Sequence, residues 1–167
     1  MNVESTSSVV VVLPNFVLKG DLATRSLRVI DLLNDQSTRF LPVENMGIFD
    51  RDSNDEITSV RKANAIKDAI EMVLLDEGDG VGDRKAFFVN QERRTAEAVI
   101  TLATSVVKGR VNLKTAKDPQ AFLSIDAGRF IAVTDVTIYN FSTAINRLKS
   151  RVAIISTSAI SSLSFVE

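Results

Sequence analysis

The chain consists mainly of short apolar segments separated by turn-forming residues. These segments are rich in Val, Ile, Phe and Thr and are bounded by Asn, Asp, Ser, Pro or Gly, a pattern typical of short antiparallel strands. The fold class that this pattern predicts is mainly β with α insertions. In chain order, the predicted strands are Val9–Leu13, Phe16–Ala23, Phe40–Phe49, Ala86–Asn90, Thr95–Val99, Val99–Ala103, Val106–Leu113, Phe130–Phe141, Val152–Ser156 and Ala159–Val166.

Two parts of the chain resemble one another. Lys19-Gly20 recurs as Lys108-Gly109, and Arg39-Phe40 recurs as Arg129-Phe130, at offsets of 89 and 90 residues. A glycine in the middle of a strand destabilises it unless the sheet bends sharply there. The sequence therefore predicts two tandem five-stranded, strongly bent antiparallel sheets or small barrels, related by a pseudo-two-fold repeat.

The pattern also predicts the domain boundaries and one long insertion. Residues 1–8 are expected to be disordered, residues 9–98 to form the first repeat with a helical insertion at 52–84, and residues 99–167 to form the second repeat. Apolar residues at intervals of three and four predict an amphipathic helix from Glu56 to Leu75, and a shorter helix is expected within Ser26–Asn34.

The apolar stripe of the long predicted helix has two interpretations. It packs against the two sheets, or it is a docking surface for a partner protein. The partner-binding candidates on this stripe are Ile57, Val60, Ile66, Ile70 and Val73.

Composition narrows the classes of function. The chain has no His and no Cys, so the commonest general base and the thiolate metal ligands are missing, and we expect neither enzymatic activity nor a cofactor. The longest apolar run, Val9–Leu13, is too short to span a bilayer. We therefore expect no membrane association and a cytoplasmic location.

One acidic segment resembles the start of a calcium-binding loop. Asp50, Asp52 and Asn54 place oxygen atoms at alternating positions, but Asp55 stands where such a loop needs Gly and Arg61 where it needs Glu. An ordinary acidic turn explains the same residues.

The charges are balanced over the whole chain, with 20 Lys and Arg against 21 Asp and Glu. Binding of nucleic acid would therefore need a local basic patch. Solvated hairpin ends are the alternative interpretation of the basic clusters. The candidate residues are Arg93, Arg94, Arg147, Lys149 and Arg151.

Each half resembles the Sm or LSm family of small β-barrels. Leu18–Leu22 and Val107–Val111 carry the resemblance, and Phe87–Asn90 and Ala153–Ser156 stand where the second motif of that family begins. The resemblance implies a tandem small barrel, and for that family RNA binding. The chain departs from the family at the RNA-reading positions, because no Asp and Asn pair follows either glycine at the usual distance and no basic-Gly pair stands in the last hairpin. The chain is also similar to uncharacterised bacterial proteins built from the same Gly-x-Leu and Phe-Leu-x-Val units.

These observations favour a protein-interaction or assembly module, an adaptor or scaffold whose partner is another protein or a second copy of the chain. Two alternatives stay open. One is an RNA-binding tandem Sm-like barrel, and the other is a calcium-dependent or carboxylate-based site at residues 50–56.

Overall fold

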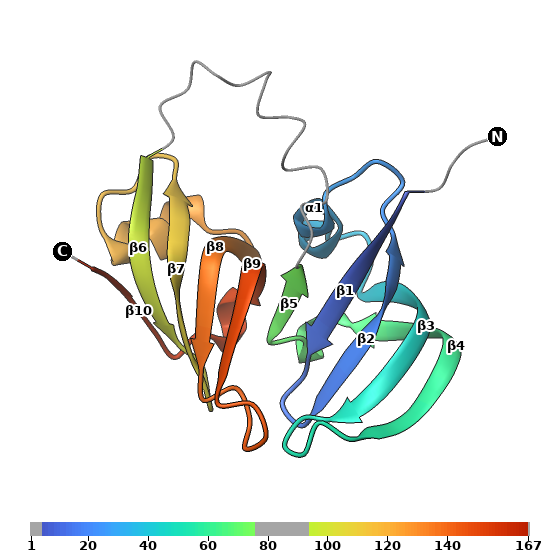
Figure 1. The fold of residues 1–167 in the computed structure, drawn as a ribbon. Coiled ribbons are helices and arrows are strands. Elements are labelled where there is room, and N and C mark those ends of the chain that lie inside the picture. The colour runs from blue at the N-terminus through green and yellow to red at the C-terminus, as the bar shows by residue number, and fades with distance from the viewer. Residues whose placement is uncertain (1–4, 76–93, 167) are drawn as a thin grey trace.

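The computed structural model describes residues 5–75 and 94–166, which we call the first half and the second half. The fold is mainly β, as predicted, and the ten strands of these described residues join one antiparallel sheet (Figure 1). The strands are β1 (Thr6–Val12), β2 (Phe16–Ala23), β3 (Phe40–Asp50), β4 (Glu56–Ile66), β5 (Met72–Leu75), β6 (Arg94–Thr101), β7 (Val106–Leu113), β8 (Phe130–Tyr139), β9 (Arg147–Ser156) and β10 (Ser162–Phe165).

Both halves arrange their strands in the same order. The sheet runs β10-β6-β7-β8-β9-β5-β1-β2-β3-β4, so in each half the fifth strand pairs with the first and the fourth lies at the far side. Each half also ends in a 3-10 turn and a four-residue strand, and the turns Lys67–Ala69 and Thr157–Ala159 lie 90 residues apart. We call two residues at the same place in this order, 89 or 90 positions apart, corresponding residues.

The sheet is open, and the barrel alternative is wrong. A closed barrel would need the fourth and fifth strands of one half to pair with each other. In the described residues β5 instead pairs with β9 of the other half, and β4 and β10 are the two edges of the sheet. Figure 1 shows these two edges on opposite sides of the molecule.

The predicted helix Glu56–Leu75 is also wrong. Residues 56–66 form β4, and a 3-10 turn then leads into β5. In β4, Ala63 and Ala65 face inward at alternate positions, whereas every residue of β5 is buried. The turn between these strands changes the phase of the apolar pattern. Together, the two strand patterns place apolar residues at intervals of three and four, which is the spacing typical of a helix. The helical insertion at 52–84 is therefore absent from its described part, and residues 76–84 lie outside the described residues.

Four other predictions have different outcomes. A short helix lies within Ser26–Asn34, at α1 (Val29–Asn34), and its residues Val29 and Leu33 are buried. Strand β1 begins at Thr6, inside the segment 1–8 expected to be disordered, whose residues 1–4 lie outside the described residues. The strands predicted separately at Thr95–Val99 and Val99–Ala103 form one strand, β6, which crosses the predicted boundary between the repeats and pairs with β7 and β10. The strand predicted at residues 86–90 lies outside the described residues.

Glycine permits close approach of two strands in both halves. At Gly20 a Cβ atom would lie 2.6 Å from Val43 Cγ1 and 2.7 Å from the Glu44 oxygen, and the β2–β3 register shifts there. At Gly109 a Cβ atom would lie 2.5 Å from Val133 Cγ1, and the β7–β8 register shifts in the same way. The bulged partner strands contain Asn45 and Asp135, with φ of 48° and 52°.

Candidate interaction edges and the central junction

The two halves meet where β5 pairs with β9, and we call this contact the central junction. Met72 lies opposite Ile155 and Leu75 opposite Val152. Side chains alternate across it: Met72 and Leu74 pack with the apolar core of the second half, whereas Val73 and Leu75 pack with that of the first. Each core thus uses residues from both halves, so burial of apolar surface holds the halves together.

A buried ion pair lies beside the central junction. Arg51 Nη1 lies 2.7 Å from Glu71 Oε2, and both side chains are at most 10% exposed. Arg51 Nε donates a hydrogen bond to the Phe141 oxygen of the second half at 3.2 Å, and its guanidinium lies 5.1 Å from the Phe141 ring. Nη2 of Arg51 is buried without a hydrogen-bond partner among the described residues. The buried Arg51 cation therefore depends on the Glu71 carboxylate to offset the cost of its burial.

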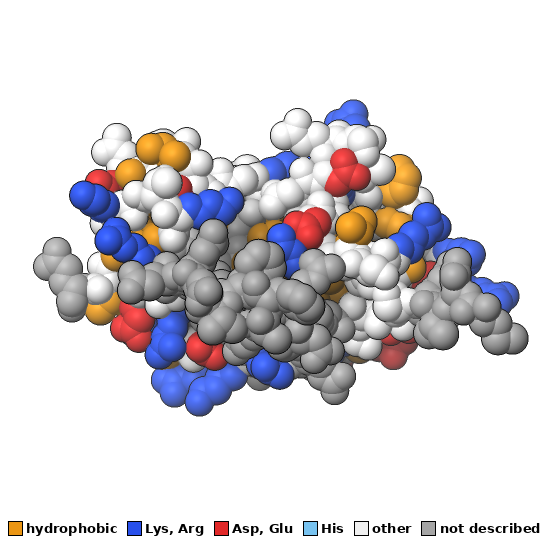
Figure 2. All heavy atoms as spheres, turned by 90° about the horizontal axis from the view of Figure 1, so that it is seen from above, with side chains coloured by type: hydrophobic (Ala, Val, Ile, Leu, Met, Phe, Trp, Pro, Cys, Tyr) orange, Lys and Arg blue, Asp and Glu red, His pale blue; other side chains and the backbone are white. Residues whose placement is uncertain are grey.

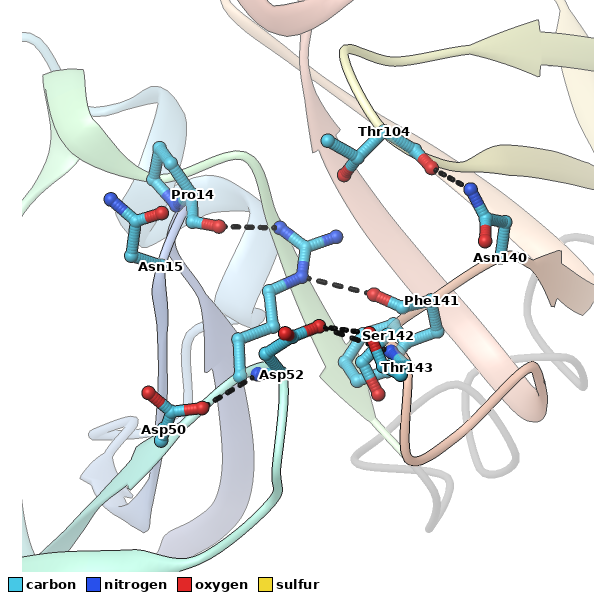
Figure 3. Close-up of a pocket in the computed structure, with 10 residues that line it drawn as sticks. Pro14, Asn15, Asp50, Asp52, Thr104, Asn140, Phe141, Ser142 and Thr143 are labelled. Atoms are coloured by element: carbon cyan, nitrogen blue, oxygen red, sulfur yellow. Dashed lines mark hydrogen bonds between the residues drawn. The ribbon is translucent and has the colours of Figure 1, made fainter.

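Further polar contacts link the halves at both ends of this junction. Asp52 accepts hydrogen bonds from the backbone N–H and hydroxyl of Thr143, as Figure 3 shows. Both residues line a pocket of about 370 Å³. At the other end, Asn34 at the end of α1 accepts a hydrogen bond from the Phe130 N–H at 2.8 Å and donates one to the Phe130 oxygen. Asp68 pairs with Arg129. The halves are thus fixed relative to one another by specific contacts.

The candidate calcium residues have other partners in the structure. Asp50 accepts backbone hydrogen bonds from Ser53 and Asp52, and the Ser53 bond is the main cause that lowers the pKa of Asp50 below its ordinary value. Asn54 has a positive φ of 62° in the same turn. No group of three or more His, Cys, Asp or Glu side chains within residues 5–75 and 94–166 is placed to hold a metal ion.

The partner-binding candidates divide into two sets. Ile57, Val60 and Ile66 lie on the edge strand β4 and are 56%, 37% and 51% exposed. Ile70 and Val73 are 2% and 0% exposed and belong to the core of the first half. The sequence therefore located an exposed apolar surface, but it placed that surface on a helix rather than on a strand edge.

The nucleic-acid candidates of β9 belong to a larger basic face that sequence reasoning missed. Thr137 of β8 lies between Lys108 of β7 and Lys149 of β9 in the register, and Tyr139 lies opposite Arg147. The Lys108 and Arg147 cations lie 5.4 Å and 4.9 Å from the Tyr139 ring centroid. The basic face consists of Lys108, Arg110, Arg147, Lys149 and Arg151.

Acidic side chains lie beside the basic face and lower its local positive charge. Asp135 lies 3.8 Å from Arg110, and Glu97 is the strand neighbour of Arg110. Arg94 is exposed at the start of β6, and Arg93 lies outside the described residues. Figure 2 shows several Lys and Arg side chains together at the left of the view, over the second half. Pairing of β7 and β9 with β8 brings Lys108 and Arg110 near the basic residues of β9. Sequence spacing alone does not reveal this pairing.

Comparison with known proteins gave no match to a family model, a curated protein or a solved structure. No helix within the described residues is long and apolar enough to cross a bilayer.

Proposed function

We propose that the chain is a non-enzymatic assembly module, an adaptor or scaffold that binds its partner by adding a strand to an open edge of its sheet. The observation that carries this proposal is β4, an 11-residue edge strand on which Ile57, Val60 and Ile66 are exposed. Its neighbour on one side is β3, and its other side offers free backbone N–H and C=O groups in the described part of the chain.

The proposal includes a common origin for the two halves, as a tandem duplication of one five-stranded unit. Three features support it: the shared strand order, the offset of 89 to 90 residues, and the glycine bulge of each half. The resemblance to Sm-like proteins belongs to this proposal as well, although the sheet is open.

The test compares two triple variants in affinity capture. Replacing Ile57, Val60 and Ile66 by Lys charges the edge of β4 without changing a buried residue, so the variant folds and loses its partner. The matched control replaces three other exposed apolar residues by Lys. They are Leu27, Leu123 and Ile125, which are 54%, 39% and 70% exposed and lie outside β4. Equal capture by the β4 variant and the wild type would contradict the proposal, whether the bait recovers another protein or a tagged second copy.

A second candidate function, binding of an anionic polymer such as RNA, is favoured by the basic face around Tyr139. Cations at this spacing neutralise phosphates, and an aromatic ring among them offers a stacking surface. Binding of oligo-U should weaken steeply with salt, and Lys149→Gln should reduce the salt slope by about 1. Arg61→Gln, the control on β4 of the first half, should leave the slope unchanged. No binding at low salt would exclude this function.

A further inference from the structure

The central junction contains, within one chain, a complete example of how the two kinds of edge in this sheet pair. A fifth strand, β5, pairs there with a fourth strand, β9. The strands left open at the ends of the sheet are again a fourth strand, β4, and a fifth strand, β10. They lie on opposite sides of the molecule, so one chain cannot pair them with each other (Figure 1).

We propose that β10 of one chain pairs with β4 of a second copy of the same chain, in the register of the central junction; this inference rests on the proposed assembly function and names its partner. Shifting the β5–β9 register by 90 residues places Ser162 opposite Ala65, and Phe165 opposite Lys62, of the second copy. The intermediate pairs are Leu163 with Asn64 and Ser164 with Ala63.

Burial on the fifth strand supports this partner. Ile70, Val73 and Leu75 are 2%, 0% and 6% exposed beside β9. The corresponding residues Ile160, Leu163 and Phe165 are only partly buried. An added fourth strand would complete their burial as β9 does in the first half.

Burial on the fourth strand supports the same geometry. Ser150, Ile154 and Ser156 of β9 are buried at the central junction, at 8%, 2% and 2% exposure. The corresponding residues Val60, Asn64 and Ile66 of β4 are exposed. Two of these three are more apolar than their buried counterparts, so their exposure in a lone chain is unfavourable and pairing would relieve it.

The contact joins two different edges, so it is heterologous. A pair of copies then keeps one free β4 and one free β10, and repetition of the contact gives a ring if the rotation closes or a filament if it does not. In both cases every contact between chains is the same β10–β4 pair.

The absence of Cys from the sequence allows a register-specific cross-linking test. Two proteins are made, Ala63→Cys and Ser164→Cys, and are mixed under mild oxidation. Directly opposed residues of antiparallel strands have Cα atoms about 4.5–5.5 Å apart, a distance that a disulfide spans. We expect a covalent dimer of two 18.3-kDa chains in the mixture and little from either protein alone.

The off-register control pairs Ser164→Cys with Asn64→Cys, whose side chains would lie on opposite faces of the sheet. Cross-linking of the control as efficient as that of the test pair would overturn the proposal. So would a cross-link formed by Ser164→Cys alone, which would indicate a symmetric contact instead.

A second measurement uses light scattering over a range of concentrations. Asn64→Ile copies the central junction and should lower the concentration for half-maximal association by about tenfold, whereas Asn64→Lys should raise it by about tenfold. Ser59→Lys, on β4 but outside the predicted pairs, should leave it near the wild-type value.

A strictly monomeric wild type that forms no in-register cross-link would overturn self-pairing. Loss of a different bound protein on charging β4 would then leave the assembly function standing. If the charged β4 variant also binds every partner as the wild type does, both proposals fail.

Discussion

The two halves of the sheet use the same strand order, but they differ in what covers the fifth strand. At the central junction, the first half places Val12 of β1 and Met72 and Leu74 of β5, which are at most 4% exposed. The corresponding residues beside the open edge β10 are Thr101, Ser162 and Ser164. Thr101 Oγ1 and Ser162 Oγ share a 2.6 Å hydrogen bond there. On the fifth strands, the paired strand β5 thus has apolar side chains where the edge strand β10 has small polar ones.

The polar contacts differ in the same direction. Arg51, Glu71 and Asp68 are specific to the central junction, and the residues that correspond to them are Phe141, Ser161 and Ser158. A second copy would therefore meet β10 without the buried ion pair and without the second salt bridge. We therefore expect pairing at the open edges to be weaker than the pairing at the central junction.

The exposed faces of the two fourth strands differ as well. Ile57 and Ser59 of β4 correspond to Arg147 and Lys149 of β9. The first half thus offers an apolar edge suited to a protein strand, and the second half offers a cationic face suited to an anionic partner.

The largest expected effect is at the ion pair of the central junction. Glu71→Leu leaves the Arg51 cation buried without its carboxylate, so the free energy of unfolding should fall by about 3–5 kcal/mol. Chemical denaturation measures it. The matched change Ser161→Leu, at an exposed position of the second half, should cost less than about 1 kcal/mol. Equal effects would show that the two fifth strands are not distinguished by the ion pair.

A smaller effect is expected at Lys67. Its buried ammonium donates hydrogen bonds to the Leu32 and Asp35 oxygens at 2.7 Å and 2.8 Å. Lys67→Met leaves these acceptors unpaired and should lower the free energy of unfolding by about 3 kcal/mol. The corresponding Thr157 donates to the Arg129 oxygen at 2.9 Å, and Thr157→Val should cost about 1 kcal/mol. Thermal denaturation of the two variants tests this ratio, and a costlier Thr157 change would refute it.

The glycine bulges should respond alike in the two halves. Gly20→Ala and Gly109→Ala each force a backbone oxygen and a valine to move, so each should lower the free energy of unfolding by about 2 kcal/mol. Gly47→Ala serves as the control, because the three atoms nearest to its Cβ would all belong to the side chain of Phe49 and none to the backbone. Urea denaturation curves would break the correspondence between the halves if only one bulge were sensitive.

The smallest effect concerns acid stability of the second half. Burial alone would raise the pKa of Asp126, but hydrogen bonds from Ala116, Thr115 and Lys114 lower it to about 2. A carboxyl whose folded pKa lies below its unfolded value stabilises the fold above about pH 4, and this contribution is lost as the pH falls towards 2. The melting temperature of Asp126→Asn should therefore lie below that of the wild type at pH 7, and the difference should vanish near pH 2. Asp135→Asn, with Asn45 at the corresponding position, is the control and should change little at either pH.

The sequence predicted the mainly β fold, most strand positions in the described residues, and the exposed apolar residues of β4. It failed at Glu56–Leu75, because periodicity sums the patterns of successive elements and a three-residue turn between two strands shifts their phase. It also named Ile70 and Val73 as partner-binding candidates, although both are buried beside β9, about 80 residues further along the chain.

By itself the sequence determined local preferences: which segments outside Glu56–Leu75 are extended, where Gly20 and Gly109 let the sheet bend, and which chemistry is missing without His and Cys. The tertiary structure alone decided that β5 pairs with β9, that Arg51 and Glu71 become a buried pair, and that Lys108 joins Arg147 around Tyr139. The physical reason is that strand neighbours come from distant parts of the chain. Backbone hydrogen bonds join strands without depending on the chain segments that separate those strands in the sequence. Sequence spacing therefore cannot reveal which edges meet and which stay open.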